Sequence, residues 1–91
     1  MLLNISREFT SNDAPILLGR TEHCKIKFED PSLSRIQCRI DYIGEKWYIK
    51  DGNGEKGSMN GTWIFAEDEI KLEPDTIIKS GESLFKVNML L

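Results

Sequence analysis

The clearest pattern along the chain is a short-range alternation of apolar and polar residues, which is typical of half-buried β-strands. The alternation occurs at residues 25–28, 36–42, 47–50, 70–73 and 85–89. A further apolar run, Pro15-Ile16-Leu17-Leu18, precedes Gly19 and Arg20. No segment of helical length carries an apolar stripe with helical spacing. The pattern therefore predicts an all-β protein.

Most of these stretches are bounded by residues that favour turns. The turn segments are Asp30-Pro31-Ser32, Ile43-Gly44-Glu45, Asp51-Gly52-Asn53-Gly54, Glu73-Pro74-Asp75 and Ser80-Gly81-Glu82. Short strands at close spacing with Gly and Pro turns favour a β-sandwich or a small barrel. The polar segment 51–60 is predicted to be a surface loop, which is where binding residues commonly lie on a β-scaffold.

The composition is that of an ordinary globular protein, with 91 residues, of which 40% are hydrophobic and 30% are charged. A chain of this size can form one core but not two, so we expect a single domain over residues 1–91. It contains no apolar run long enough to cross a membrane, and because residues 1–8 lack a basic start followed by a long apolar stretch, we expect no signal peptide. We expect Cys24 and Cys38 to be buried thiols in a reducing, intracellular compartment, nuclear or cytoplasmic.

The net charge and the residue types present disfavour several function classes. The net charge of −3 disfavours nucleic-acid binding, which depends on many cations. His23 beside Cys24 does not form a four-ligand metal set, and we expect no cofactor. No nucleophile–base pair or paired carboxylates indicate an enzyme. Between Arg20 and Arg39, however, cations outnumber acids, so a local site for a small anion is possible.

Three polar clusters lie at the ends of expected strands: Gly19-Arg20, Ser32-Leu33-Ser34-Arg35 and Ser58-Met59-Asn60-Gly61-Thr62. Guanidinium, hydroxyl and amide groups at neighbouring loop edges can surround a tetrahedral dianion. Arginine presents a planar fork that matches phosphate oxygens, and hydrogen bonds to a charged group are about twice as strong as neutral ones. The clusters therefore indicate a phosphate-binding site.

In order and spacing, these clusters resemble the forkhead-associated (FHA) domain, together with Glu22-His23-Cys24-Lys25-Ile26, Asp30-Pro31 and Asp51. The resemblance runs from about Pro15 to Val87. It implies an eleven-stranded β-sandwich of two mainly antiparallel sheets, of the SMAD/FHA type. It also implies binding of phosphothreonine peptides through loops at one end of the sandwich.

The resemblance assigns roles to individual residues. Arg20 and Ser34 would contact the phosphate and Arg35 would add charge, while Asn60 would hydrogen-bond the peptide backbone. A further set would support the loops: Gly19, Gln37, Ser58, Gly61 and Thr62. No metal or catalytic residue is implied.

The chain departs from the family pattern at three places. Gln37 stands where the family usually has histidine, and Met59 stands where a serine or threonine commonly contacts the phosphate. The connection between Asp51 and Ser58 is longer than usual. It could displace Asn60 or add a peptide contact of its own.

Two functions follow as hypotheses. The first is a phosphothreonine-binding protein-interaction module in signalling, expected to be a monomer without nucleic-acid or membrane partners. The second, motivated by the three departures, is the same fold used for phosphate-independent interaction or dimerisation. The sequence leaves open whether the domain belongs to a larger protein. It also leaves open which partner and kinase the domain serves and which flanking residues it prefers.

Overall fold

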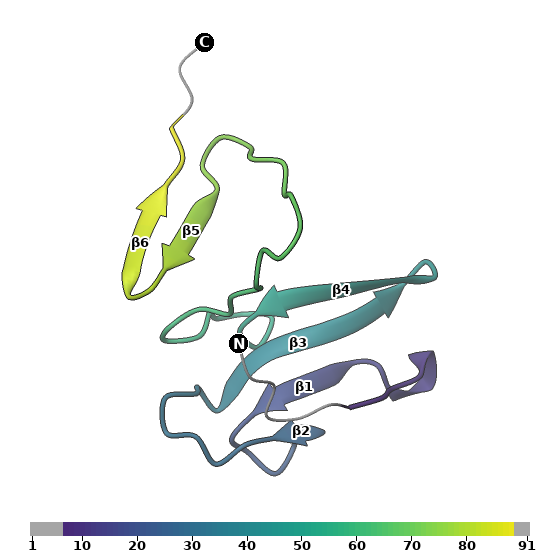
Figure 1. Cartoon of the computed structure of the whole chain (residues 1–91). Helices are drawn as coiled ribbons and strands as arrows, with labels where there is room; N and C mark the ends of the chain where they lie inside the picture. The colour runs from purple at the N-terminus through teal and green to yellow at the C-terminus, as the bar shows by residue number, and fades with distance from the viewer. Residues whose placement is uncertain (1–6, 89–91) are drawn as a thin grey trace.

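The computed structural model describes residues 7–88, which form six β-strands and one short 3-10 turn. The strands are β1 (Ile16–Gly19), β2 (Ile26–Lys27), β3 (Ile36–Ile43), β4 (Lys46–Asp51), β5 (Ile77–Ser80) and β6 (Ser83–Lys86), and the 3-10 turn is η1 (Ser11–Asp13). No α-helix occurs in residues 7–88, and therefore no helix there could span a membrane. The prediction of an all-β fold is confirmed (Figure 1).

The strands form two separate sheets. The larger sheet has the order β2-β1-β3-β4, with β1 parallel to β2 and antiparallel to β3. The connection between β3 and β4 is the two-residue turn Gly44-Glu45, with φ values of 57° and 64°. Positive φ at both positions is the geometry that matches the twist of a tight hairpin. The second sheet is the β5–β6 hairpin.

The small core is formed by side chains of the larger sheet and of the turn before β2. Its buried hydrophobic residues are Ile16, Cys24, Ile26 and Cys38, contributed by β1, β2, β3 and the turn before β2. Both cysteines are free thiols, as the sequence analysis predicted. Burial raises the pKa of the Cys38 thiol above its ordinary value of 9.0, so Cys38 packs as a small apolar side chain.

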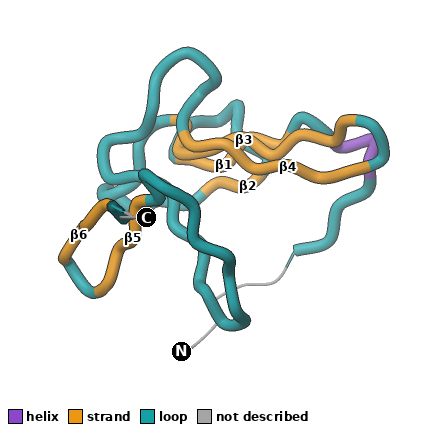
Figure 2. The backbone as a smooth tube through the Cα atoms, turned by 90° about the horizontal axis from the view of Figure 1, so that it is seen from above, coloured by secondary structure: helices purple, strands orange, loops and turns teal. Residues whose placement is uncertain are grey.

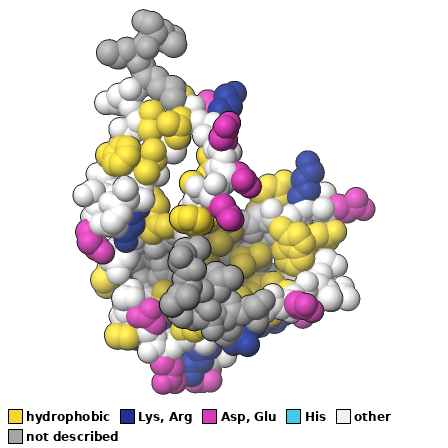
Figure 3. Space-filling view, viewed as in Figure 1, with side chains coloured by type: hydrophobic (Ala, Val, Ile, Leu, Met, Phe, Trp, Pro, Cys, Tyr) yellow, Lys and Arg dark blue, Asp and Glu magenta, His cyan; other side chains and the backbone are white. Residues whose placement is uncertain are grey.

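The second sheet stands apart from the first, as two views of the backbone show (Figures 1 and 2). Eight large apolar side chains in the segment 63–86 are exposed: Trp63, Ile64, Phe65, Ile70, Leu72, Ile77, Leu84 and Phe85. Hydrophobic side chains also gather over the β5–β6 hairpin in the space-filling view (Figure 3). We call residues 63–86 the C-terminal segment.

The predicted strand count and one predicted strand position are wrong. Residues 7–88 contain six strands, not eleven, because the long connections 20–25, 28–35 and 52–76 form no ladder with a neighbouring strand. The alternation at 70–73 predicted a strand, yet Ile70 and Leu72 are exposed and have no partner strand. Conversely, β5 was missed because its two isoleucines are adjacent and do not alternate. Residue 89 of the last predicted strand lies outside the described residues.

Candidate functional site

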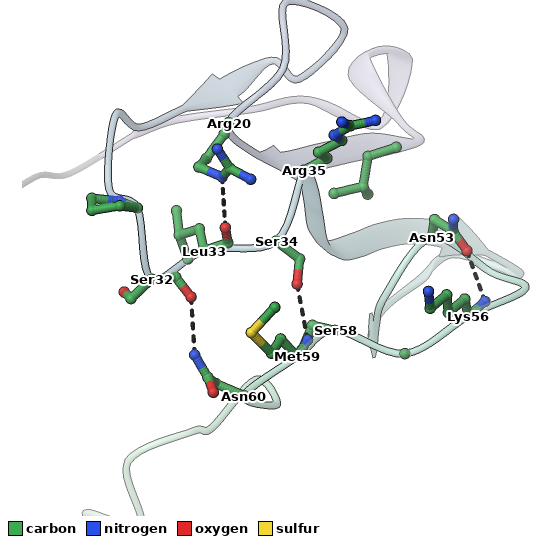
Figure 4. Close-up of a pocket in the computed structure, with 13 residues that line it drawn as sticks. Arg20, Ser32, Leu33, Ser34, Arg35, Asn53, Lys56, Ser58, Met59 and Asn60 are labelled. Carbon is green, nitrogen blue, oxygen red and sulfur yellow. Dashed lines mark hydrogen bonds between the residues drawn. The ribbon is translucent and has the colours of Figure 1, made fainter.

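A cavity of about 640 Å³ lies at the end of the larger sheet where β1 stops and β3 begins. Its walls come from three separate parts of the chain, as Figure 4 shows. The lining residues are Arg20, Pro31, Ser32, Leu33, Ser34, Arg35, Ile36, Asn53, Lys56, Gly57, Ser58, Met59 and Asn60. We call this end of the molecule, formed by Gly19, Arg20 and the segments 30–37 and 51–62, the loop end. The four residues predicted to contact phosphate or peptide all line this one cavity.

Arg20 reaches the cavity because Gly19 lets two chain segments approach closely. A Cβ atom on Gly19 would lie 2.1 Å from the carbonyl oxygen of Arg35, a separation that no side chain could tolerate. The backbone amide of Arg20 then donates to that carbonyl oxygen at 3.0 Å. The Arg20 Nε donates to the carbonyl oxygen of Leu33 at 2.6 Å. One edge of the guanidinium is thus fixed, and the two terminal nitrogens have no acceptor within residues 7–88.

Ser34 and Asn60 join the segments on either side of the cavity. The Ser34 hydroxyl oxygen accepts a hydrogen bond from the Met59 amide at 2.9 Å. The Asn60 Nδ2 donates to the carbonyl oxygen of Ser32 at 3.1 Å. Since a hydroxyl has one proton to donate and a carboxamide has two N–H bonds and an oxygen, both side chains keep groups for a ligand.

The turn before Ser34 is fixed by an acidic residue. The hydroxyl and the amide of Ser32 both donate to Asp30 Oδ1, at 2.7 and 2.9 Å. These two hydrogen bonds hold the pKa of the Asp30 carboxyl below its ordinary 3.8. The carboxylate is therefore satisfied within its own turn. Arg35 makes no ion pair with it, or with any other carboxylate in residues 7–88.

Gln37 connects the segments behind the cavity, and its side chain is buried, with 6% exposed. Its Oε1 accepts from the Ser34 amide at 2.9 Å, while its Nε2 lies 2.8 Å from the carbonyl oxygen of Gly61. The same nitrogen lies 3.1 Å from Ser58 Oγ and 3.3 Å from Thr62 Oγ1. Glutamine can fill this position because its amide accepts on one side and donates on the other.

Asp51 is a supporting residue that the sequence analysis did not assign to the site. Its Oδ2 accepts from the Ser58 amide at 2.9 Å, and its Oδ1 accepts from the hydroxyls of Ser58 and Thr62. Burial alone would raise the pKa of this carboxyl, but the donors from Ser58 and Thr62 together hold it below the ordinary 3.8. The sequence does contain a pattern that indicates this supporting role, because Asp51 ends an expected strand and the hydroxyl residues Ser58 and Thr62 follow in the next loop.

Three residues of the connection 52–57 line the cavity, namely Asn53, Lys56 and Gly57, although none of them was assigned to the site from sequence. The sequence analysis noted this long connection as a departure from the family pattern that could add a peptide contact. In the structure, its loop closes tightly. Asn53 Oδ1 accepts from the amides of Glu55 and Lys56 at 2.9 and 2.8 Å.

The charge of the cavity wall differs in sign from that of the chain. Arg20, Arg35 and Lys56 line it, and none of the lining residues is acidic, although the chain as a whole carries −3. Charge-assisted hydrogen bonds from such cations suit an anionic group. The fold and the cavity thus define an all-β domain with a cationic loop site.

The comparison with protein families gives the same class. The family model described as FHA domain matches residues 16–84, which is 69 of the 91 residues. The chain belongs to the FHA domain family. FHA domains are generally phosphopeptide-binding protein-interaction modules. The comparisons with curated proteins and with solved structures gave no match.

Proposed function

We propose that this domain binds a phosphothreonine-containing segment of a partner protein in the cavity at the loop end. The observation that carries the proposal is the wall with three cations and no acid in an acidic chain. A phosphorylated threonine brings a charge of about −1.5 to −2 and three acceptor oxygens. The unmodified side chain offers none of this charge, so phosphorylation would switch binding on.

Each lining group has a role that matches its free hydrogen-bonding capacity. The terminal nitrogens of Arg20 and the proton of the Ser34 hydroxyl would bind phosphate oxygens. The Asn60 amide would bind the backbone of the partner beside the phosphothreonine. Leu33 and Met59 bring apolar side chains to the same cavity, and these would contact the threonine methyl group and favour phosphothreonine over phosphoserine.

A second hollow of about 770 Å³ adjoins the first and shares four of its residues, Ser32, Leu33, Met59 and Asn60. It extends toward Trp63 and the β5–β6 hairpin. A partner segment seated in the first cavity therefore has room for the residues that flank its phosphothreonine.

The proposed role is binding and not catalysis. The polar groups of the first cavity are cations, hydroxyls and amides. General acid–base chemistry typically uses an imidazole or a carboxyl group placed at the reacting atom, and the lining residues include neither. We propose a monomeric module that docks one intracellular phosphoprotein.

Titration calorimetry with a degenerate phosphothreonine peptide library and its unphosphorylated counterpart tests this function. We expect the unmodified protein to bind only the phosphorylated library. Arg20→Ala should weaken binding about ten- to a hundredfold, which corresponds to about 1.5–3 kcal/mol for a hydrogen bond to a charged group. Arg7→Ala removes the same charge outside the cavity and should leave binding unchanged. Equal affinity for both libraries would overturn the proposal.

A second candidate function is association with a second copy of the domain. It is favoured by the eight exposed apolar side chains of the C-terminal segment, because large exposed apolar patches commonly mark interaction surfaces. Sedimentation at several concentrations separates the two candidates. A concentration-dependent dimer that ignores phosphopeptides would favour self-association, and a monomer that binds them would exclude it.

A further inference from the structure

We propose that the outer edge of β4 is a second interaction surface, which binds an extended acidic segment of a partner protein as an added strand. The ligand is a stretch in which glutamate or aspartate alternates with apolar residues. Phosphorylation plays no part in this recognition. The inference therefore goes beyond the proposed function and does not depend on it.

The first observation is that β4 has a neighbouring strand on one side only. It is the outer strand of the larger sheet, next to β3 (Figure 1). The two-residue turn Gly44-Glu45 sets Ile43 opposite Lys46, and in such a hairpin this first pair exchanges hydrogen bonds. The alternation of an antiparallel ladder then directs the amides and carbonyls of Trp47 and Ile49 away from β3. Among residues 7–88, the backbone hydrogen bonds outside the strand ladders involve neither residue.

The second observation is that β4 is open to solvent. Every residue from Lys46 to Lys50 is exposed. An exposed strand edge presents a row of donors and acceptors, which an extended peptide can pair with when it adds to the sheet. The main chain then supplies affinity, and the alternate side chains supply specificity. The edge of β4 thus has the geometry for an added strand.

The third observation is the charge on one face of β4. Because side chains alternate along a strand, Lys46, Tyr48 and Lys50 share this face. Neither lysine forms an ion pair within residues 7–88. Asp41 lies across from Tyr48, but Arg39 already pairs with it at 2.8 Å. A strand with acids at positions i and i+4 would place one carboxylate beside each lysine, and opposite charges on neighbouring strands attract.

The opposite face of β4 is apolar. Trp47 and Ile49 lie there across from Tyr42 and Ile40 of β3, and the rings of Tyr42 and Trp47 are 4.9 Å apart. Trp47 and Ile49 remain 43% and 44% exposed. The residues between the acids of an added strand point to this face. Apolar residues at those positions would cover Trp47 and Ile49, so the two faces together define the alternating pattern of the ligand.

The same charges disfavour a second copy of the domain at this edge. Two β4 strands paired antiparallel along their whole length would set Lys46 of each copy opposite Lys50 of the other. Like charges directly opposite each other are destabilising, and lysines on an edge strand commonly prevent pairing between copies. An acidic segment meets attraction where a second copy meets repulsion.

The test uses unphosphorylated peptides and measures their binding to the whole chain by fluorescence anisotropy. We expect a peptide of alternating glutamate and valine to bind, and a peptide of alternating lysine and valine not to bind. N-methylation of every second amide of the glutamate–valine peptide should abolish binding in one phase and preserve it in the other, because only alternate amides face β4. Equal binding of the two charge patterns, or equal effects of the two methylation phases, would overturn the inference.

Substitutions in β4 locate the surface. Lys50→Glu should weaken binding of the glutamate–valine peptide about three- to tenfold, since it replaces an attraction by a repulsion. Lys86→Glu makes the same change on an exposed lysine of β6, in the other sheet, and should leave binding within about twofold. Equal losses in the two variants would place the peptide elsewhere and overturn the inference.

A proline tests the backbone of the same edge. Ile49→Pro removes an amide proton that points away from β3, which is where an edge strand tolerates proline. It should weaken binding about three- to tenfold, the effect of one lost hydrogen bond, whereas Ile49→Val keeps the amide and should bind within about twofold of the unmodified protein. Equal binding by the two variants would contradict an added strand. The methylated peptides test the same hydrogen bonds without altering the protein.

The phosphothreonine peptide library separates this inference from the proposed function. Lys50→Glu should leave phosphothreonine binding within about twofold, and Arg20→Ala should leave glutamate–valine binding unchanged. If the glutamate–valine peptide does not bind, the second surface is disproved while the phosphothreonine site stands. If only the phosphothreonine peptides fail to bind, the proposed function falls and the β4 edge stands. A dimer that Ile49→Pro dissociates would show that a second copy occupies the edge, and would overturn the inference.

Discussion

The loop end and the C-terminal segment are held together by different kinds of contact. At the loop end, side chains bond to residues far away in the sequence, such as Asn60 to Ser32 and Met59 to Ser34. In the C-terminal segment, the hydrogen bonds join close neighbours in sequence or the two strands of one hairpin, such as Thr76 to Glu73. The loop end has few buried apolar residues, and the C-terminal segment exposes most of its own.

This difference shows how a small domain can fix a binding site without a large core. Each hydrogen bond contributes only about 0.5–1.5 kcal/mol net, but a buried donor or acceptor left without a partner costs about 1–3 kcal/mol. A connected set such as Gln37, Asp51, Ser58 and Thr62 therefore strongly favours one arrangement of the loops. The exposed side chains of the C-terminal segment impose no such requirement, since water surrounds both their folded and unfolded forms.

The largest effect is expected from the glycine at the start of the loop end. Gly19→Ala places a methyl group 2.1 Å from the Arg35 carbonyl oxygen and should lower the free energy of unfolding by about 3 kcal/mol or more, at the upper end of overpacking effects. Gly81→Ala, in the β5–β6 turn, meets no atom within 4 Å and has φ of 60°. Its cost should be about 1–2 kcal/mol, from backbone strain alone. Urea denaturation of both variants measures the comparison, and equal losses would contradict it.

The second effect is a pH dependence centred on Asp51. Its hydrogen bonds from Ser58 and Thr62 hold the folded-state pKa below the ordinary 3.8. A carboxyl with a lowered folded pKa adds stability that is present above its unfolded pKa and is lost as the pH falls through the folded value. Asp51→Asn, which puts an amide opposite these donors, should cost about 1.5–3 kcal/mol at neutral pH.

Urea denaturation of the unmodified protein and Asp51→Asn from pH 7 to pH 2 isolates this carboxyl, because the other acids contribute equally to both. The difference in unfolding free energy should be nearly constant down to about pH 4 and should then shrink with further acidification. A difference that stays constant down to pH 2 would show that Asp51 does not act through its charge.

Much of the loop end could be predicted, because the pattern of strands and turns located the polar clusters and the resemblance to the FHA domain assigned roles to their residues. Arg20 directly follows β1 and Ser34 lies two residues before β3, so the ends of these adjacent strands bring both to one edge, whereas Asn60 reaches the cavity from the long connection after β4. Lys56 could not be placed in the same way. Its position depends on the close approach of Gly52 to the Lys56 carbonyl and on the Asn53 turn, which are three-dimensional features.

The C-terminal segment was predicted less well for a physical reason. Alternation reports which face of a strand is apolar, but a strand also needs a neighbour for its backbone hydrogen bonds. The stretch 70–73 has the alternation and no neighbour, while β5 has β6 beside it and no alternation. Pairing therefore decided both outcomes, and pairing is a property of the whole chain.

The smallest effect compares the same substitution in a packed and an exposed place. Ile16 in β1 has 1% of its surface exposed, and Ile64 in the C-terminal segment has 70% exposed. Removing one methyl group by Ile16→Val should cost about 0.5–1.5 kcal/mol, since the core closes only partly over the gap. Ile64→Val should change the free energy of unfolding by less than about 0.5 kcal/mol. Urea denaturation of the two variants checks this at one concentration well below any self-association. A loss at Ile64 as large as that at Ile16 would mean that the C-terminal segment is packed in solution, and the contrast between the two regions would fail.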